Sequence, residues 1–168
     1  MKDLKTKLDE KDLMLLNRLQ ENGRETYSNL AKALKVSEAA VYMRVNRLIR
    51  SGFIRSFTAI LDESKLSLNI TAFVSVRANP TKYERVLQEL SEMPEVLEVH
   101  DVTGDYYALL KVKTRSKEDL SELLNRIGLL EGVISTETKI VLKTLKETVK
   151  LPLDIIDRKK SALTKINE

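Results

Sequence analysis

The sequence predicts an α+β protein with a helical N-terminal domain and a C-terminal domain of alternating strands and helices. Over about the first 50 residues, apolar side chains recur at helical spacing. Beyond residue 61 the order becomes strand, helix, strand, strand, helix, strand, and its two halves match at an offset of 37 residues: Val86-Leu87 corresponds to Leu123-Leu124. The expected domain ranges are 1–60, 61–150 and a C-terminal extension, 151–168.

The first domain begins with two helices. Asp9 is expected to cap a helix from Glu10 to Asn22, with Asp12 at its third position. Thr26 is suited to cap a second, shorter helix, which ends at a tight turn at Lys35-Val36. The predicted buried stripe of the first helix is Leu13, Leu16 and Leu19.

A third helix should begin after Ser37 and run to Arg50, with Gly52 in the left-handed conformation that ends it. Two short helices joined by a tight turn indicate a helix-turn-helix. The alternative is an ordinary solvated helix. The expected buried side chains are Val41, Val45, Leu48 and Ile49, and the expected opposite face is Ala40, Met43, Arg44 and Arg47.

The segment from Gly52 to Ile60 is rich in β-branched and aromatic residues and predicts a strand, either a wing on the helix-turn-helix or a hinge between domains. Leu61 to Asn69 is polar and turn-like. We therefore expect a winged helix-turn-helix domain with a linking strand, and a domain boundary near residue 61.

The second domain should open with a strand from Ile70 to Arg77 and a helix that Asn79-Pro80 caps and starts, with Pro at its first position. Two strands, Pro94 to Thr103 and Tyr106 to Lys113, should follow, joined by a two-residue turn at Gly104-Asp105. The expected apolar stripe of the helix is Tyr83, Val86, Leu87 and Leu90.

Ser116 is expected to cap the second helix of this domain, and Val133 to Leu142 should form its last strand. The apolar stripe of this helix is Leu120, Leu123, Leu124 and Ile127. The resulting β-α-β-β-α-β order predicts a ferredoxin-like sandwich, with both helices on one face of a four-stranded antiparallel sheet.

The other face of such a sheet has no helix to cover it. Phe73, Leu109 and Val141 are the apolar residues expected there. Because bare apolar sheet surface usually marks an interface, we expect a homodimer formed sheet against sheet. Pro152 and the basic run 158–160 lie in the extension, where Asp154 is suited to cap a short helix that either packs on a partner subunit or remains a loose tail.

The charge of the chain is unevenly distributed. Residues 1–60 carry 12 Lys and Arg against 7 Asp and Glu, a net charge of +5, while residues 61–168 carry 17 against 18. This asymmetry indicates a polyanionic partner for the first domain. There is no cysteine, no apolar run long enough to span a bilayer and no signal-peptide pattern at the N-terminus, so we expect a cytoplasmic protein.

Four segments resemble the leucine-responsive regulator/AsnC (Lrp/AsnC, feast/famine) family of prokaryotic transcription regulators. L-D-E-K-D-L-M-L-L-N-R-L-Q-E-N-G-R resembles the first helix of that family, and A-K-A-L-K-V-S-E-A-A-V-Y-M-R-V-N-R-L-I-R-S-G-F-I resembles its helix-turn-helix. V-T-G-D-Y-Y-A-L-L-K-V resembles the hairpin of its regulatory (RAM) domain, and E-G-V-I-S-T-E-T-K-I-V-L-K its last strand. The resemblance covers about residues 8–150. It implies a homodimer, or a tetramer or octamer, that binds pseudo-palindromic double-stranded DNA and an amino-acid effector.

A DNA-binding surface needs a helix in the major groove and positive charge along the phosphates. Arg44 and Arg47 are the best candidates for base or phosphate contact, whereas Arg50 and Arg55 are candidates for the backbone. The candidate DNA-binding set is Thr26, Tyr27, Ser37, Glu38, Ala39, Ala40, Met43, Arg44, Arg47 and Arg50.

The resemblance places an effector near Gly104, Asp105 and Tyr106. The carboxylate of Asp105 suits an ammonium group, and the alternative is that Gly104-Asp105 is only a tight turn. Tyr107 stands where the family usually has a second acidic residue. The candidate effector-binding set is Thr103, Gly104, Asp105, Tyr106, Ser135, Thr136 and Thr138.

No catalytic residue, cofactor or metal site is expected. His100 is the single histidine, and neither metal-ligand spacing nor a glycine-rich phosphate loop surrounds it. The alternatives to an effector-gated regulator are an architectural nucleic-acid binder without an effector and an enzyme on a ferredoxin-like scaffold.

Overall fold

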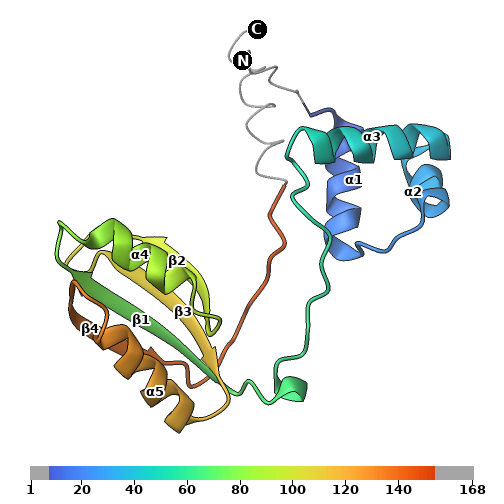
Figure 1. Cartoon of the computed structure of the whole chain (residues 1–168). Helices are drawn as coiled ribbons and strands as arrows, with labels where there is room; N and C mark the ends of the chain where they lie inside the picture. The colour runs from blue at the N-terminus through green and yellow to red at the C-terminus, as the bar shows by residue number, and fades with distance from the viewer. Residues whose placement is uncertain (1–7, 154–168) are drawn as a thin grey trace, which may run out of the picture. The chain divides into compact units, whose positions relative to one another are not determined.

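The computed structural model describes residues 8–153, so the predicted helix after Asp154 lies outside the described residues. The chain divides into two compact units (Figure 1). Among the described residues, one comprises 8–60 and 147–153, and the other Leu61 to Lys146. No helix among residues 8–153 has the length and apolar content that crossing a membrane requires.

The helical unit contains α1 (Glu10–Glu21), α2 (Tyr27–Leu34) and α3 (Glu38–Arg50). As predicted, all three begin where a side chain caps the first turn: Asp9 and Asp12 form a reciprocal capping box, and the hydroxyls of Thr26 and Ser37 each accept a backbone N–H. Their apolar faces form one core, which contains Leu15, Leu30, Ala31, Leu34, Val41, Val45 and Leu48.

Four side chains in this unit differ from the predicted burial pattern. Leu15 is fully buried and Leu16 and Leu19 only partly, because the core-facing side of α1 is rotated from the predicted stripe. Ile49 is 42 % exposed, since it lies beyond the edge of the core formed by Val41, Val45 and Leu48.

The predicted strand from Gly52 to Ile60 is wrong, and with it the predicted wing. This segment forms no strand, although Ile54 packs on the helical core and its N–H donates to the Leu48 carbonyl at 3.1 Å. A strand needs a neighbour to complete its ladder, and no described strand lies beside this one. A short 3₁₀ helix, Ser64–Leu66, follows.

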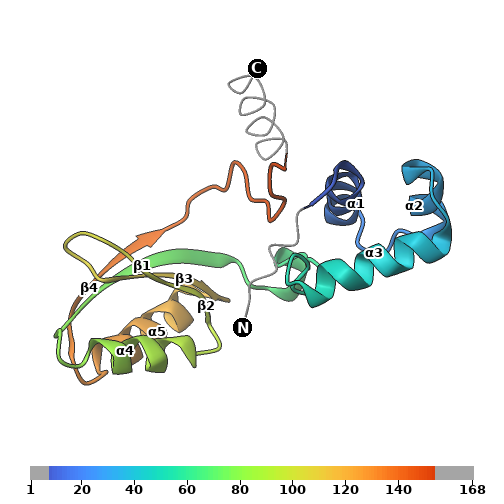
Figure 2. The same cartoon turned by 90° about the horizontal axis from the view of Figure 1, so that it is seen from above.

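The second unit has the predicted ferredoxin-like order: β1 (Ile70–Ala78), α4 (Tyr83–Ser91), β2 (Val96–Asp101), β3 (Ala108–Thr114), α5 (Lys117–Gly128) and β4 (Val133–Ile140). The sheet order is β2-β3-β1-β4, and all three pairings are antiparallel. Figure 2 shows both helices on one side of the sheet. They bury the alternate residues of β1 and β3, Ala72, Val74, Val76, Leu110 and Val112.

Two predicted turns differ in the structure. Pro80 precedes α4 instead of occupying its first position, because the Asn79 carboxamide accepts from the N–H and hydroxyl of Thr81 and forms a separate turn. The predicted two-residue hairpin at Gly104-Asp105 is a six-residue loop, 102–107, since the ladder of β2 and β3 ends at the pair Asp101 and Ala108.

Gly132 fixes the close approach of β4 to the start of α4. Its φ is +109°, and a Cβ there would stand 2.7 Å from the Cβ of Lys82. Its carbonyl accepts the N–H of Asn79 at 2.7 Å. Only glycine meets both conditions without strain.

The chain after β4 returns to the helical unit at α1. The N–H of Leu151 donates to the Gln20 carboxamide oxygen at 2.7 Å, and the carboxamide nitrogen donates back to the Leu151 carbonyl at 3.3 Å. Lys150 Nζ lies 2.5 Å from Glu21 Oε1. Residues 150 and 151 are thus bound to the last turn of α1.

Candidate nucleic-acid interface and ligand loop

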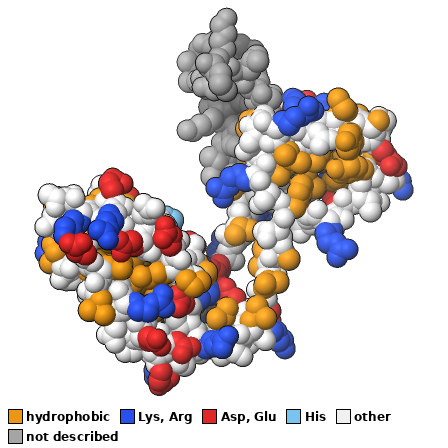
Figure 3. Space-filling view, in the orientation of Figure 1, with side chains coloured by type: hydrophobic (Ala, Val, Ile, Leu, Met, Phe, Trp, Pro, Cys, Tyr) orange, Lys and Arg blue, Asp and Glu red, His pale blue; other side chains and the backbone are white. Residues whose placement is uncertain are grey.

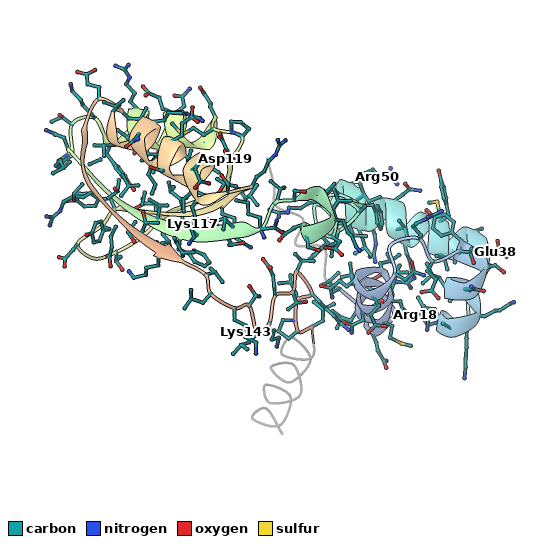
Figure 4. All side chains as sticks on the ribbon, turned by 90° about the horizontal axis from the view of Figure 1, so that it is seen from below. Arg18, Glu38, Arg50, Lys117, Asp119 and Lys143 are labelled. Carbon is teal, nitrogen blue, oxygen red and sulfur yellow. The ribbon has the colours of Figure 1, made fainter. Side chains whose placement is uncertain are left out.

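The outward face of α3 lies opposite Val41, Val45 and Leu48, and Glu38 and Arg50 mark its two ends in Figure 4. Tyr42 and Met43 are its most exposed large side chains, at 54 % and 60 %. Asn46 is half-buried beside Tyr42 and donates to the Tyr42 carbonyl at 3.1 Å. The outward side chains are Glu38, Ala39, Tyr42, Met43, Asn46 and Arg50.

Arg44 and Arg47, predicted on the outward face, turn their guanidinium groups to α1. Arg44 Nη1 lies 2.7 Å from Asp9 Oδ2 and 2.7 Å from Asp12 Oδ1, and Arg47 also donates to Asp12. The Asp12 side chain is fully buried, whereas those of Arg44 and Arg47 are 26 % and 40 % exposed. This network fixes the orientation of α3 against α1.

The ionisation of Asp12 follows from its contacts. Burial acts to raise its pKa, but the hydrogen bond from the Asp9 N–H and the guanidinium groups of Arg47 and Arg44 together outweigh burial. The pKa of Asp12 therefore lies below its usual value, and the carboxylate is charged at neutral pH.

The start of α2 lies beside the outward face of α3. The Thr26 hydroxyl caps α2 and is exposed, and the ring of Tyr27 meets that of Tyr42 edge to face with centroids 6.1 Å apart. The structure thus brings Tyr27 together with Tyr42 on the outward face of α3. Tyr42 and Asn46 were missed from the sequence, although their spacing from Ala39 and Met43 already placed them on one helix face.

In the second unit, the loop 102–107 is anchored from several elements. The Val102 N–H donates to the Tyr107 carbonyl at 2.8 Å, and the Tyr107 N–H donates to the Val76 carbonyl at 3.1 Å. Arg77 Nε donates to the Asp105 carbonyl at 3.2 Å. Gly104, with φ at +122°, takes the conformation that favours glycine. Thr103, Gly104 and Asp105 are exposed, and Tyr106 is half-buried.

Tyr83 holds the same loop from α4. Its hydroxyl donates to the Tyr107 carbonyl at 3.0 Å, and the two rings meet with centroids 5.5 Å apart. Burial, with the carboxylate of Asp101 nearby, raises the pKa of Tyr83 to about 12. The phenol is therefore neutral and remains a hydrogen-bond donor throughout the physiological range.

The candidate residues on β4 divide between the two faces of the sheet. Ser135 pairs with Arg77, so it lies on the open face, beside the residue that anchors Asp105. Thr136 pairs with Val76 and Thr138 with Val74, which face the helices. Ser135 therefore lies on the open face of the sheet, and Thr136 and Thr138 lie on the face that the helices cover.

His100 lies on the open face of β2, 55 % exposed, with Nε2 3.1 Å from Glu98 Oε2. Among residues 8–153, no cluster of three or more potential metal ligands is present.

Two family models match the chain. The AsnC-type helix-turn-helix domain matches residues 8–49, and the Lrp/AsnC ligand binding domain matches residues 71–151. Curated relatives include the HTH-type transcriptional regulator FL11 of Pyrococcus horikoshii, 37 % identical over 89 % of this chain and 99 % of its own length. Another is the HTH-type transcriptional regulator LysM of Saccharolobus solfataricus, 36 % identical over 82 % of this chain and 95 % of its own.

Solved structures also match the chain. A transcriptional regulator of Neisseria meningitidis in complex with L-Met matches with a TM-score of 0.84 and 29 % identity, covering 89 % of this chain and 99 % of that one. AsnC of E. coli matches with a TM-score of 0.81 and 29 % identity, and the match covers 86 % of this chain and 98 % of that one.

Proposed function

The chain belongs to the Lrp/AsnC family of transcriptional regulators, and from this premise we propose that it is a cytoplasmic, homodimeric, sequence-specific DNA-binding protein whose α3 enters the major groove. The observation that carries the proposal is α3 itself. One side is buried in the helical core, its start is capped by Ser37, and its other side presents Glu38, Tyr42 and Met43 to solvent. The net charge of +5 on residues 1–60 supports a polyanionic partner.

The N-terminal half of a recognition helix contacts base edges, which assigns base reading to Glu38, Ala39, Tyr42 and Met43. A glutamate accepts from the cytosine amino group, and alanine or methionine offers apolar contact to a thymine methyl. The side chains suited to phosphates are Thr26, Tyr27, Ser37 and Arg50.

Arg44 and Arg47 take a double role in this proposal. Asp12 holds one nitrogen of each guanidinium group, so the N–H groups that do not face Asp12 remain to contact phosphate. Their first role is to hold α3 at a fixed angle against α1 through Asp12. Removing either arginine should therefore affect both the stability of the helical unit and its affinity for DNA.

We assign dimerisation to the open face of the sheet. Phe73, 38 % exposed, lies on it with half-buried Leu109 and Val141. The face is more polar than the sequence suggested, because alternate positions also carry charged pairs such as Lys111–Glu98 and Lys139–Glu137. Apolar side chains also gather on the helical unit (Figure 3). Separately, Phe53 and Phe57 of this unit are 44 % and 49 % exposed. Apolar surface of this kind is typical of surfaces that another chain covers.

A dimer presents two α3 helices and so doubles the number of base pairs read. It is expected to bind a pseudo-palindrome whose half-sites lie about one helical turn, or a multiple of it, apart. Further assembly to tetramers or octamers is part of the proposal. Sedimentation equilibrium tests it: a protein that stays monomeric at micromolar concentration would contradict the dimer.

We further propose that an amino acid binds near the loop 102–107 and modulates DNA binding. The exposed backbone of Thr103, Gly104 and Asp105, and the anchoring of this loop by β1 and α4, support a preformed site. Calorimetric titration with each of the twenty amino acids tests it. No heat of binding with any of them would refute the effector.

Selection of bound duplexes from a random pool tests the DNA-binding proposal. It should enrich a sequence with two inverted half-sites, and affinity for that sequence should fall by roughly 0.9 log units per log unit of salt for each neutralised phosphate. Binding without any enriched sequence would favour the architectural alternative.

A further inference from the structure

We infer that residues 147–153 form a strap that holds the helical unit at the last turn of α1, and that Gln20 and Glu21, which bind this strap, determine the half-site spacing that a dimer accepts. The inference rests on the proposed dimeric DNA binding. It concerns two residues outside the candidate DNA-binding set, on a helix other than α3.

The strap is bound to α1 through both backbone and side-chain groups. The Gln20 carboxamide accepts the Leu151 N–H at 2.7 Å and donates to the Leu151 carbonyl at 3.3 Å, so it satisfies both backbone groups of one residue. Lys150 Nζ lies 2.5 Å from Glu21 Oε1, and Leu153 is 9 % exposed. A chain end that is not tied down has neither such pairing nor such burial. These contacts therefore attach the strap to the helical unit.

A second segment meets the same end of α1. The linking segment, residues 51–69, follows α3. Its Phe57 ring lies against Gly23, just beyond α1, where a Cβ at residue 23 would stand 3.3 Å from Phe57 Cδ1. The strap and the linking segment are therefore attached to the helical unit close to each other, at Gln20 and Gly23.

In the sheet unit the two segments also start from one place. The buried Lys113 side chain donates to the Glu63 carboxylate and, at 3.1 Å, to the Thr71 hydroxyl, which ties the linking segment to the sheet. The Val141 N–H donates to the Thr71 carbonyl at 2.9 Å, just after β4. Thr71 thus lies at the root of both segments.

Both segments are short. Six chain steps separate Glu63 from Phe57, and nine separate Val141 from Lys150. Fully extended, the segments therefore span at most about 20 Å and about 30 Å. A single segment leaves the helical unit free to turn about it, because each residue adds two soft backbone dihedrals. With the strap attached, turning would wind the two segments about each other, and their lengths allow little winding.

The restriction reaches α3 through rigid contacts. Arg18 Nε donates to Glu25 Oε2 at 3.0 Å, which closes the corner after α1. Asp12 then joins α1 to Arg44 and Arg47 of α3. A dimer whose helical units are held in this way presents its two α3 helices at one separation, whereas released units would reach several. Half-site spacing is therefore the property that the strap should control.

Gel-shift titration of the full chain on three duplexes tests the inference. They carry the selected half-sites at their own spacing, the same half-sites with five base pairs inserted, and a single half-site. Five base pairs are about half a helical turn, so the insertion should lower the affinity of the unmodified chain by about 100-fold, because the gain from two linked half-sites is lost. In Gln20→Ala/Glu21→Ala the insertion should lower affinity by less than about tenfold, and affinity for the single half-site should stay within about twofold.

Glu10→Ala/Asn17→Ala is the matched control, since it removes one carboxylate and one carboxamide of α1 that do not bind Lys150 or Leu151. It should keep the full loss of affinity on insertion. Gln20→Glu keeps an acceptor for the Leu151 N–H but has no donor for the Leu151 carbonyl, so its loss on insertion should be intermediate. Hydrogen exchange at the Leu151 amide reports release of the strap in each variant.

Two results would overturn the inference. If the double variant Gln20→Ala/Glu21→Ala loses as much affinity on insertion as the unmodified chain, these residues do not control spacing, whether or not the Leu151 amide exchanges faster. If it loses affinity equally for all three duplexes, the strap only stabilises the helical unit. An unmodified chain that selects no paired half-sites would instead refute the proposed dimeric DNA binding, and this inference with it.

Discussion

Replacement of Asp12 by alanine should loosen α3 from α1. The change removes a fully buried carboxylate that accepts from Arg44 and Arg47. Breaking a buried ion pair costs about 3–5 kcal/mol when the remaining charge stays buried. Because the two arginine side chains are 26 % and 40 % exposed, water can solvate them, which reduces this cost. Loss of the hydrogen bond to the Asp9 N–H at 3.0 Å adds about 1 kcal/mol. The expected total is about 2–4 kcal/mol.

Hydrogen exchange measured amide by amide is the appropriate assay, because it reports each unit separately. A loss of about 2 kcal/mol corresponds to roughly 30-fold faster exchange at α1 and α3. Amides of α4 and α5 should not change. Glu10→Ala is the control, since Glu10 is an exposed carboxylate in the same first turn. Less than about threefold acceleration in Asp12→Ala would refute the reasoning.

The ion pairs of Asp12 with Arg44 and Arg47 also predict that the stability of the helical unit depends on pH. The pKa of Asp12 is lower in the folded state, so its contribution to stability is fully present above its ordinary value of 3.8 and is lost as the pH falls through the folded value. The difference in exchange between the unmodified chain and Asp12→Ala should therefore shrink below about pH 4. A difference that stays constant down to pH 2 would show that the carboxylate charge is not what stabilises α3.

Three further outcomes follow from other contacts. Gly132→Ala should destabilise the sheet unit by about 1–3 kcal/mol, because residue 132 has a left-handed conformation. The thermal midpoint measured by circular dichroism should fall in this variant. It should not fall in Gly128→Ala, since a Cβ at residue 128 would point into open space. Gln20→Ala should accelerate hydrogen exchange at the Leu151 amide about tenfold, and an unchanged rate would contradict the binding of residues 150 and 151 to α1. Arg50→Ala should weaken binding to all DNA sequences alike and reduce the salt slope by about one, so selective loss for one sequence would argue against a phosphate contact.

Helix starts could be predicted from the sequence because their determinants are local. Asp9, Thr26, Ser37 and Ser116 each accept a hydrogen bond from an N–H three residues later, within a single turn of chain. The β-α-β-β-α-β order was predictable for a similar reason. Each strand and helix has a hydrophobic period that can be read from the residues inside it.

The errors arose where the determining partner is distant in sequence. Arg44 and Arg47 were placed on the outward face because nothing within α3 indicates Asp12, which lies 32 and 35 residues away. The residues from Gly52 to Ile60 have the composition of a strand but no described neighbour strand. The loop 102–107 was predicted as a two-residue turn, since its anchors, Arg77 and Tyr83, come from elements that precede it by more than 20 residues.

The central claim is that the N-terminal half of α3 reads bases in two symmetric half-sites. Base-by-base affinity of Glu38→Ala on the selected duplex tests this claim most directly, with Glu10→Ala as control, since both residues occupy the first position of a capped helix. Glu38→Ala should lose about 1–3 kcal/mol of discrimination at one base pair in each half-site, at symmetric positions, and nowhere else. A uniform change across all positions, or the same change in Glu10→Ala, would contradict it.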